Sequence, residues 1–292
     1  MNVNSTKGQQ LAGPSMKEKC MSESGASNPK AGQAKGAAKF PLFYKNPVPL
    51  QSKTHAQTQL SKKADFAFAA NSTAVPIIAR EVPIAAQNYP IVFTGGENPQ
   101  PFVVLGLAAN QNLFVNPDGT WRPKCYIPAY VRRYPFILIT SESAQRVLLS
   151  IDEDCARIGN EETVDGNKLF DEDGKPTPTT DTATKFCQDF HKEFQTTLNF
   201  GKAVAASGIL RPNQLNIKNG DKQSTALQGF QIVDEKALRA LPDETILEWH
   251  KKGWLSLLNM HLASQYHWNS LRSISGLAVD KATEADVSGA VH

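Results

Sequence analysis

Residues 121–136 read WRPKCYIPAYVRRYPF, and the rest of the chain is organised around them. These sixteen residues hold three tyrosines, one tryptophan, three arginines and three prolines. Tyrosine, tryptophan and arginine are the side chains that most often dominate protein contacts. The stretch contains no arrangement typical of catalysis, so it indicates how the fold is built and where a contact surface lies rather than a reaction.

Apolar, β-branched runs on both sides of this stretch predict an antiparallel sheet. They lie at 89–94, 102–107 and 112–115 before the stretch, and at 136–140 and 146–151 after it. The tetrapeptide NPDG at 116–119 has proline second and glycine fourth, which predicts a tight turn leading to Trp121. The runs together predict a β-meander.

The segment before these strands is rich in proline. Residues 40–50, FPLFYKNPVPL, predict an extended segment at the edge of the sheet, because proline cannot donate to a central ladder. Residues 74–86, AVPIIAREVPIAA, place apolar side chains at helical spacing and predict a short helix beneath the sheet. Pro83 would fall inside that helix, so we expect the helix to end or kink near Glu81.

The middle of the chain changes from an acidic loop to a long helix. Residues 152–173 are acidic and lack apolar periodicity, which predicts a loop. Over 181–207, three phenylalanines and a leucine recur at spacings of four, which predicts a long amphipathic helix. Gly208 follows as a suitable C-cap.

The C-terminal part predicts a hairpin followed by helices. Runs at 215–217 and 226–233 flank Asn219-Gly220-Asp221, a tight-turn sequence. Capping aspartates and a helix-breaking glycine predict helices over 235–241, from Asp243 to a break at Gly253, and over 254–271. The fold class expected is α+β: a mainly antiparallel β-sheet or meander, with C-terminal helices packed on it.

Composition divides the chain into three regions. Residues 1–39 are rich in small and polar types and carry six lysines and two glutamates, so we expect a disordered basic tail. Residues 40–275 are expected to form a single domain, and 276–292 a frayed C-terminal tail. The total formal charge is +3 and the first 39 residues carry +4, so the remainder carries −1. A folded face that binds nucleic acid is therefore not indicated.

The sequence also bears on location. The N-terminus has no apolar core of a signal peptide, and no run approaches the roughly 20 apolar residues of a membrane span, so we expect a cytoplasmic protein without a transmembrane segment. Surface association would need a route without a cleaved signal. The four cysteines are widely spaced, which predicts reduced thiols rather than a disulfide framework or a zinc site.

Two sets of polar residues are candidates for a site. Arg132 and Arg133 would point to opposite faces of a regular strand, so both cannot serve one site. One of them could face an anion or a partner carboxylate, or the arginines could stack on tyrosine and cover the sheet edge. Asp152 and Asp154 lie at a strand end, where acids can be catalytic or simply solvated. The candidate binding residues are Trp121, Tyr126, Tyr130, Arg132, Arg133, Tyr134, Asp152 and Asp154.

The sequence predicts no catalytic residue, metal ligand or cofactor. Asp171-x-Asp173-Gly174 matches only a fragment of a calcium loop, and the histidines at 250, 261 and 267 share no metal-binding spacing. Glycine-rich nucleotide motifs and the hydrolase elbow do not occur.

Several motifs resemble the SapC family of bacterial proteins. They are YKNPVPL at 44–50, DFAFAANSTAVPI at 65–77, YPIVF at 89–93, NLFVNPDGTWRP at 112–123, YIPAYVRRYPF at 126–136, IDED at 151–154, LFDEDGKP at 169–176 and LPDETILEWHKKGWL at 241–255. The resemblance covers about residues 40–272. It implies a connection with the bacterial surface (S-) layer or envelope, and it supplies no catalytic residues.

Two hypotheses remain open. The first is a non-enzymatic accessory or structural protein of the surface layer or envelope that acts by protein–protein contact through the aromatic-arginine stretch. The second is a cytosolic enzyme, or a substrate-presenting partner of one, with a pocket formed by Tyr126, Arg132 or Arg133, and Asp152 or Asp154. We favour the first hypothesis.

Overall fold

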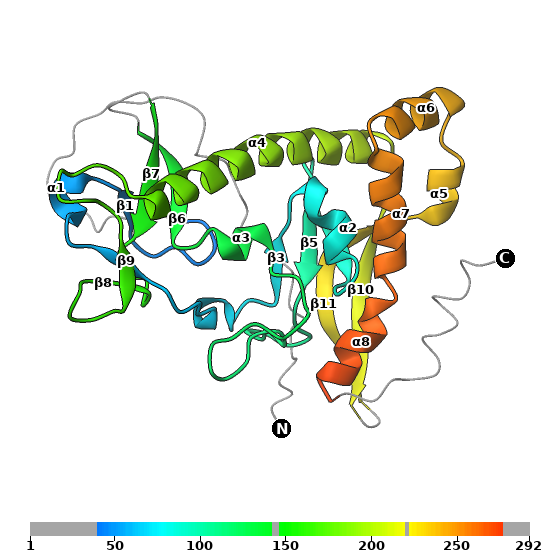
Figure 1. Ribbon diagram of the computed structural model, residues 1–292. Helices are drawn as coiled ribbons and strands as arrows, with labels where there is room; N and C mark the ends of the chain where they lie inside the picture. Colours follow the sequence, from blue (N-terminus) through cyan, green and yellow to red (C-terminus); the bar gives the residue numbers. More distant parts are fainter. Residues whose placement is uncertain (1–39, 142–145, 220–221, 277–292) are drawn as a thin grey trace, which may run out of the picture. The chain divides into compact units, whose positions relative to one another are not determined.

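The computed structural model describes residues 40–141, 146–219 and 222–276 (Figure 1). The predicted N-terminal tail and nearly all of the predicted C-terminal tail lie outside these residues. The chain divides into two compact units. In the described chain, the first unit comprises residues 65–132 and those from Phe190 onward, and the second comprises the residues up to Ala64 and 133–189. That 40–275 form one domain stays a prediction.

An antiparallel five-stranded sheet forms the centre of the first unit, with the strand order β10-β11-β4-β5-β3. Its strands are β3 (Ala74–Pro76), β4 (Ile91–Thr94), β5 (Pro101–Val104), β10 (Leu210–Asn219) and β11 (Lys222–Val233). All four residues of β5 are buried, and because successive side chains point to opposite faces, both faces of this central strand are covered. The predicted strands at 89–94 and 102–107 are found as β4 and β5, although β5 ends at Val104 and the later strands β6 (Phe136–Ser141) and β7 (Arg146–Asp152) belong to another sheet, so the runs do not form one meander. The hairpin around Asn219 is confirmed by the pairing of β10 with β11, and its turn residues 220–221 lie outside the described residues.

The first unit also contains several helices. They are η1 (Ala67–Ala69), η2 (Ala79–Glu81), α2 (Val82–Ala85), α3 (Ala129–Arg132), the later part of α4 (Pro178–Ala206), α5 (Glu235–Arg239), α6 (Asp243–Lys251), α7 (Trp254–Ser264) and α8 (His267–Ile274). Helix α7, orange in Figure 1, is fastened to the ends of the neighbouring strands β4 and β11: the Ser264 hydroxyl accepts from the Ile91 N–H at 3.0 Å, and His261 Nε2 accepts from the Val233 N–H at 3.1 Å.

Two small antiparallel sheets build the second unit, with strand orders β1-β7-β6 and β8-β2-β9. The elements are β1 (Pro47–Pro49), α1 (Ser52–His55), β2 (Gln59–Ser61), β6 (Phe136–Ser141), β7 (Arg146–Asp152), β8 (Ile158–Gly159) and β9 (Gly166–Lys168), with the first part of α4. Proline-rich β1 lies at a sheet edge, as predicted. Phe136, Ile151 and Leu169 form the centre of the core.

The predicted fold class, α+β with antiparallel sheets and C-terminal helices, is confirmed. The helix-boundary signals at Asp234, Gly208 and Gly253 are confirmed as well, because they are local, whereas the helix expected over 254–271 is divided into α7 and α8. The Asp234 carboxylate caps α5 by accepting from the N–H groups of Lys236 and Ala237. Gly208 and Gly253 adopt φ values of 70° and 72°, the left-handed region that glycine enters without steric cost, at the end of α4 and the start of α7.

The helix predicted over 74–86 is wrong in its first half. Residues 74–76 form β3, which pairs with β5, and helical structure begins only at Ala79. The 3-10 helix η2 ends at Glu81, where a break was expected, and Pro83 is the second residue of α2, a position in the first turn that needs no N–H. A free edge of the sheet therefore outweighs the helical spacing of this short apolar run.

Two further expectations are corrected. Residues 112–115 form no strand and make only a single bridge between Val115 and Trp121, which closes the predicted turn at 116–119. The segment that carries the two arginines is not a strand, because Ala129–Arg132 form the one-turn helix α3 after Pro128. The acidic segment at 152–173 is mostly loop and also contributes the short strands β8 and β9.

Candidate functional site

In the first unit, the buried carboxylate of Glu81 is the centre of a polar network. Glu81 is 4% exposed, at the end of η2. Its Oε2 accepts from the Ile78 N–H at 2.9 Å. Its Oε1 accepts from the Ala129 N–H at 2.6 Å and from the Tyr126 hydroxyl at 2.8 Å. Burial raises the pKa of Glu81, while these donors and Arg132 act in the opposite direction.

Tyr126 links this buried carboxylate to the surface. Its hydroxyl donates to Glu81 and accepts from Arg132 Nη2 at 3.0 Å. Arg132 Nε also donates to the Ile127 carbonyl at 3.0 Å, and the guanidinium lies 5.5 Å from the centre of the Tyr126 ring. Burial and the neighbouring Glu81 raise the pKa of Tyr126 to about 12, so the phenol keeps its proton at neutral pH. The exposed Arg132 is thus held in one orientation by its own neighbours.

An aromatic cluster binds the backbone of Tyr126. The Trp121 indole donates to the Tyr89 hydroxyl at 3.1 Å, and that hydroxyl donates to the Tyr126 carbonyl. The Tyr89 ring packs edge-on against Phe114, 4.7 Å between centres. Trp121 is 7% exposed and Tyr130 is 1% exposed, so these two candidates belong to the core.

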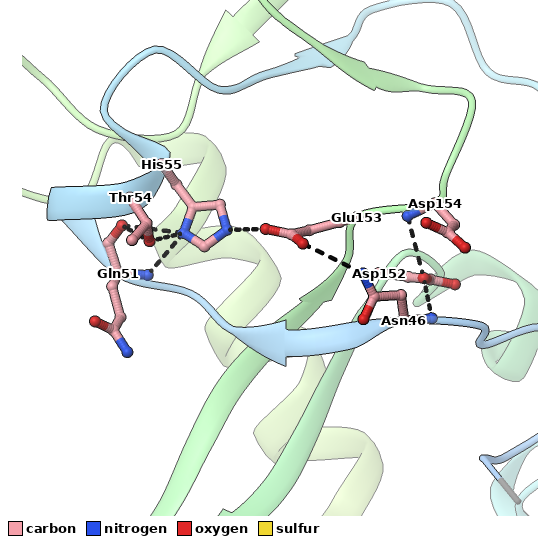
Figure 2. A network of polar contacts seen from close by, with 7 residues as sticks. All are labelled: Asn46, Gln51, Thr54, His55, Asp152, Glu153 and Asp154. Carbon is pink, nitrogen blue, oxygen red and sulfur yellow. Dashed lines mark hydrogen bonds and ion pairs between the residues drawn. The ribbon is translucent and has the colours of Figure 1, made fainter. Parts of the chain in front are cut away.

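In the second unit, Asp152 forms a separate network (Figure 2). Asp152 is fully buried at the end of β7. Its Oδ1 accepts from the N–H groups of Asn46 at 2.8 Å and Asp154 at 3.3 Å. Its Oδ2 accepts from the Lys45 N–H at 3.0 Å and from the Tyr134 hydroxyl at 3.2 Å. Backbone donors compensate the cost of burying this carboxylate and fasten residues 45–46 to β7.

The next residue, Glu153, extends this network to a buried histidine, as Figure 2 shows. Its carboxylate lies 3.3 Å from His55 Nε2 and accepts from the Asn46 side-chain amide at 3.3 Å. The Gln51 N–H donates to His55 Nδ1 at 3.1 Å, and the Thr54 hydroxyl lies 2.8 Å from the same nitrogen. Nδ1 also lies 3.0 Å from the Gln51 carbonyl oxygen, so whether this nitrogen donates or accepts depends on the tautomer of the ring.

Tyr134 and Arg133 pack against the start of the described chain. The Tyr134 ring lies edge-on to Tyr44 at 5.3 Å, and the Arg133 guanidinium lies 5.6 Å from the centre of the Tyr44 ring. Burial raises the pKa of Tyr134, with Cys155 and Asp152 acting in the same direction. The two arginines therefore have different tyrosine partners, Arg132 with Tyr126 and Arg133 with Tyr44.

The candidate residues thus divide between two networks. Tyr126, Arg132 and Trp121 are joined through Glu81 and Tyr89 in the first unit. Tyr134, Asp152 and the Asp154 N–H are joined in the second, whereas the Asp154 side chain is exposed.

Sequence reasoning missed Glu81, Tyr89, Asn46 and His55. The sequence offered a signal for Glu81 alone, because a carboxylate inside the apolar run 74–86 is unusual. The roles of Tyr89, Asn46 and His55 depend on contacts between distant parts of the chain.

Two general properties of the described residues bear on function. In residues 40–141, 146–219 and 222–276, no helix is both long and apolar enough to cross a membrane. Over the same ranges, no group of three or more histidine, cysteine, aspartate or glutamate side chains is placed to hold a metal ion.

The fold and the two networks define an α+β protein of antiparallel sheets and helices, with an arginine–tyrosine pair on the surface of one unit. The chain belongs to the SapC family, whose model matches residues 50–271. No curated protein and no solved structure matches the chain.

Proposed function

We propose that this protein is a non-enzymatic accessory or structural component connected with the bacterial surface layer or envelope, and that it acts by protein–protein contact. Membership of the SapC family supports this proposal, because the resemblance implies an envelope connection. The candidate contact surface is the exposed Arg132 with the half-buried Tyr126 beside it.

The observation that carries the proposal is the orientation of Arg132. An exposed arginine normally loses rotamer freedom when it binds, which weakens the contact. Here two hydrogen bonds, to Tyr126 and Ile127, hold the guanidinium in place before any partner arrives. A preorganised arginine beside a tyrosine is a favourable centre for a protein contact.

The hydrogen bonds of Asp152 support a structural role for the candidate residues of the second unit. Lys45, Asn46 and Tyr134 direct donors at this carboxylate from its own unit. A buried carboxylate whose oxygens accept several hydrogen bonds from its own unit is typical of one that fastens chain segments together. We therefore place the proposed contact on Tyr126 and Arg132 and assign Asp152 to stability.

The test is capture of tagged full-length protein from its own cells after in-cell crosslinking, with envelope and cytosolic fractions analysed separately. We expect one envelope or surface-layer protein to dominate, and its recovery to fall at least fivefold with Arg132→Ala. Arg239→Ala, which removes an exposed arginine from α5, is the matched control and should change recovery little.

Other results would oppose the proposal. Recovery in the cytosolic fraction with an enzyme as the main partner, or alone with a stoichiometric small molecule or metal, would favour the enzyme-related alternative. Equal capture by wild type and Arg132→Ala would remove Arg132 from the contact.

A further inference from the structure

A contiguous basic surface surrounds the preorganised arginine. We define the basic strip as residues 122–127 together with Arg132. Residues 122–124 are exposed and residues 125–127 are half-buried, so these consecutive residues form one surface segment. Arg132 joins the segment through its hydrogen bonds to Tyr126 and to Ile127.

The basic strip has a uniform sign of charge. Arg122, Lys124 and Arg132 supply three exposed cations. Residues 119–132 contain three basic residues and no acidic one, although Asp118 directly precedes them and residues 40–292 as a whole carry a net charge of −1. Glu81, the carboxylate that the strip contacts, is buried and already accepts three hydrogen bonds. An anion approaching from solvent therefore meets cations first.

The groups between the cations indicate what kind of anion fits. Pro123, Tyr126 and Ile127 separate the charges and offer apolar surface. A surface that alternates single charges with aromatic and aliphatic groups is typical of contacts with polypeptides. An exposed guanidinium, in turn, forms charge-assisted contacts with a carboxylate.

We propose that the basic strip binds an acidic polypeptide segment, with a partner carboxylate at Arg132 and apolar partner atoms on Tyr126 and Ile127. The inference rests on the proposed function in that it names the chemistry of the protein partner. Arg132 contributes the specific contact, whereas Arg122 and Lys124 attract the segment at longer range and are sensitive to salt.

The experiment measures binding of full-length protein to poly-L-glutamate by biolayer interferometry, from 20 to 150 mM salt. Arg132→Ala should weaken binding roughly tenfold, and Arg132→Lys should weaken it less, because lysine keeps the charge but loses the hydrogen bonds that position the guanidinium beside Tyr126 and Ile127. The double variant Arg122→Ala/Lys124→Ala should mainly lower the association rate and the salt dependence. Arg239→Ala should bind within about twofold of wild type.

Two results would overturn the inference. One is poly-L-glutamate binding that is equal in wild type, Arg132→Ala and the double variant. The other is tighter binding to phosphatidylglycerol vesicles than to poly-L-glutamate at matched charge, which would indicate an anionic lipid surface. If circular dichroism shows that Arg132→Ala is unfolded, the inference is judged from poly-L-glutamate binding by the double variant alone.

The two proposals can fail separately. Poly-L-glutamate binding that depends on the strip, with no envelope protein captured in cells, would reject the proposed function and leave the acidic-partner inference standing. Capture of an envelope protein that depends on Arg132, together with poly-L-glutamate binding that ignores the strip, would do the reverse.

Discussion

The Glu81 carboxylate and the Tyr126 hydroxyl lie 2.8 Å apart, across 45 positions of sequence. This hydrogen bond joins a short helical turn under the sheet to the segment that carries the basic strip. Because Tyr126 also accepts from Arg132, one buried carboxylate sets the position of a surface arginine. Stability of the first unit and the orientation of the proposed contact therefore depend on the same residue.

The first prediction concerns the pH dependence of Glu81. Its folded pKa is raised above the ordinary value of 4.5, so the protonated form is favoured in the fold. This contribution to stability is complete below pH 4.5 and is lost as pH rises through the folded pKa. Wild type should therefore lose stability relative to Glu81→Gln between pH 4.5 and 7.5, measured by urea unfolding.

The exposed Glu97→Gln is the control for Glu81 and should show a constant difference from wild type over the same range. A difference between Glu81→Gln and wild type that is flat, or that changes in the opposite direction, would contradict the burial argument.

The second prediction compares how much Asp152 and Asp154 contribute to stability. Asp152→Ala leaves the Lys45 N–H, the Asn46 N–H and the Tyr134 hydroxyl without their acceptor, and should lower the free energy of unfolding by about 3 kcal/mol. Asp154→Ala should cost less than about 0.5 kcal/mol, because its side chain is exposed. Similar costs for both variants in urea titrations would mean that the network does not hold β7 to residues 45–46.

The third prediction tests the close approach of α4 to the loop before β5. A Cβ placed on Gly201 would lie 2.0 Å from the Pro99 carbonyl oxygen, which is far inside contact distance. Although alanine favours helices more than glycine, Gly201→Ala should lower stability by about 2 to 3 kcal/mol. The neighbouring exposed Lys202→Ala should leave the thermal midpoint nearly unchanged. A stabilised Gly201→Ala would show that this approach is not tight in solution.

The fourth prediction concerns His261 in the core beneath α7. The ring is 1% exposed, and burial lowers its pKa from 6.5 to about 3. The neutral ring stabilises the fold fully above pH 6.5, and this contribution is lost as pH falls toward 3. Wild type should lose about 2 kcal/mol relative to His261→Gln between pH 6.5 and 5.0.

Urea unfolding at several pH values measures the His261 effect, and glutamine is chosen because its oxygen can still accept from the Val233 N–H. The exposed His250→Gln serves as the comparison. An acid response of His261→Gln that matches wild type would place a charged or solvated ring at this position.

Much of the fold could be predicted from local pattern, and the failures have a physical cause. Asp234, Gly208 and the NPDG turn act on backbone groups within a few residues, so their effects are visible in a short window. Residues 74–76 show helical spacing but form a strand, because they pair with β5, whose residues lie about 28 positions later in the chain. Tertiary pairing overrides a weak local preference in so short a segment.

The candidate site divides in the same way. Residues 121–136 stand out by composition, and this alone identified Tyr126 and Arg132. Composition could not show that Trp121 and Tyr130 are buried while Arg132 is exposed, since all are similarly large. Composition also could not show the importance of Glu81, because its carboxylate accepts hydrogen bonds from Tyr126 and Ala129, 45 and 48 positions later in the chain.

What the sequence by itself determined is several of the strands, the helix caps and the NPDG turn, the α+β class and the family, because each depends on residue types at short or regular spacings. What only the tertiary structure decided is which distant donors meet a buried acid. Thr197 on α4 accepts from the Ala79 N–H across 118 positions, and this bond helps to hold the turn that presents Glu81. Buried polar groups must find partners wherever the chain brings them, so their pairing is a property of the complete fold.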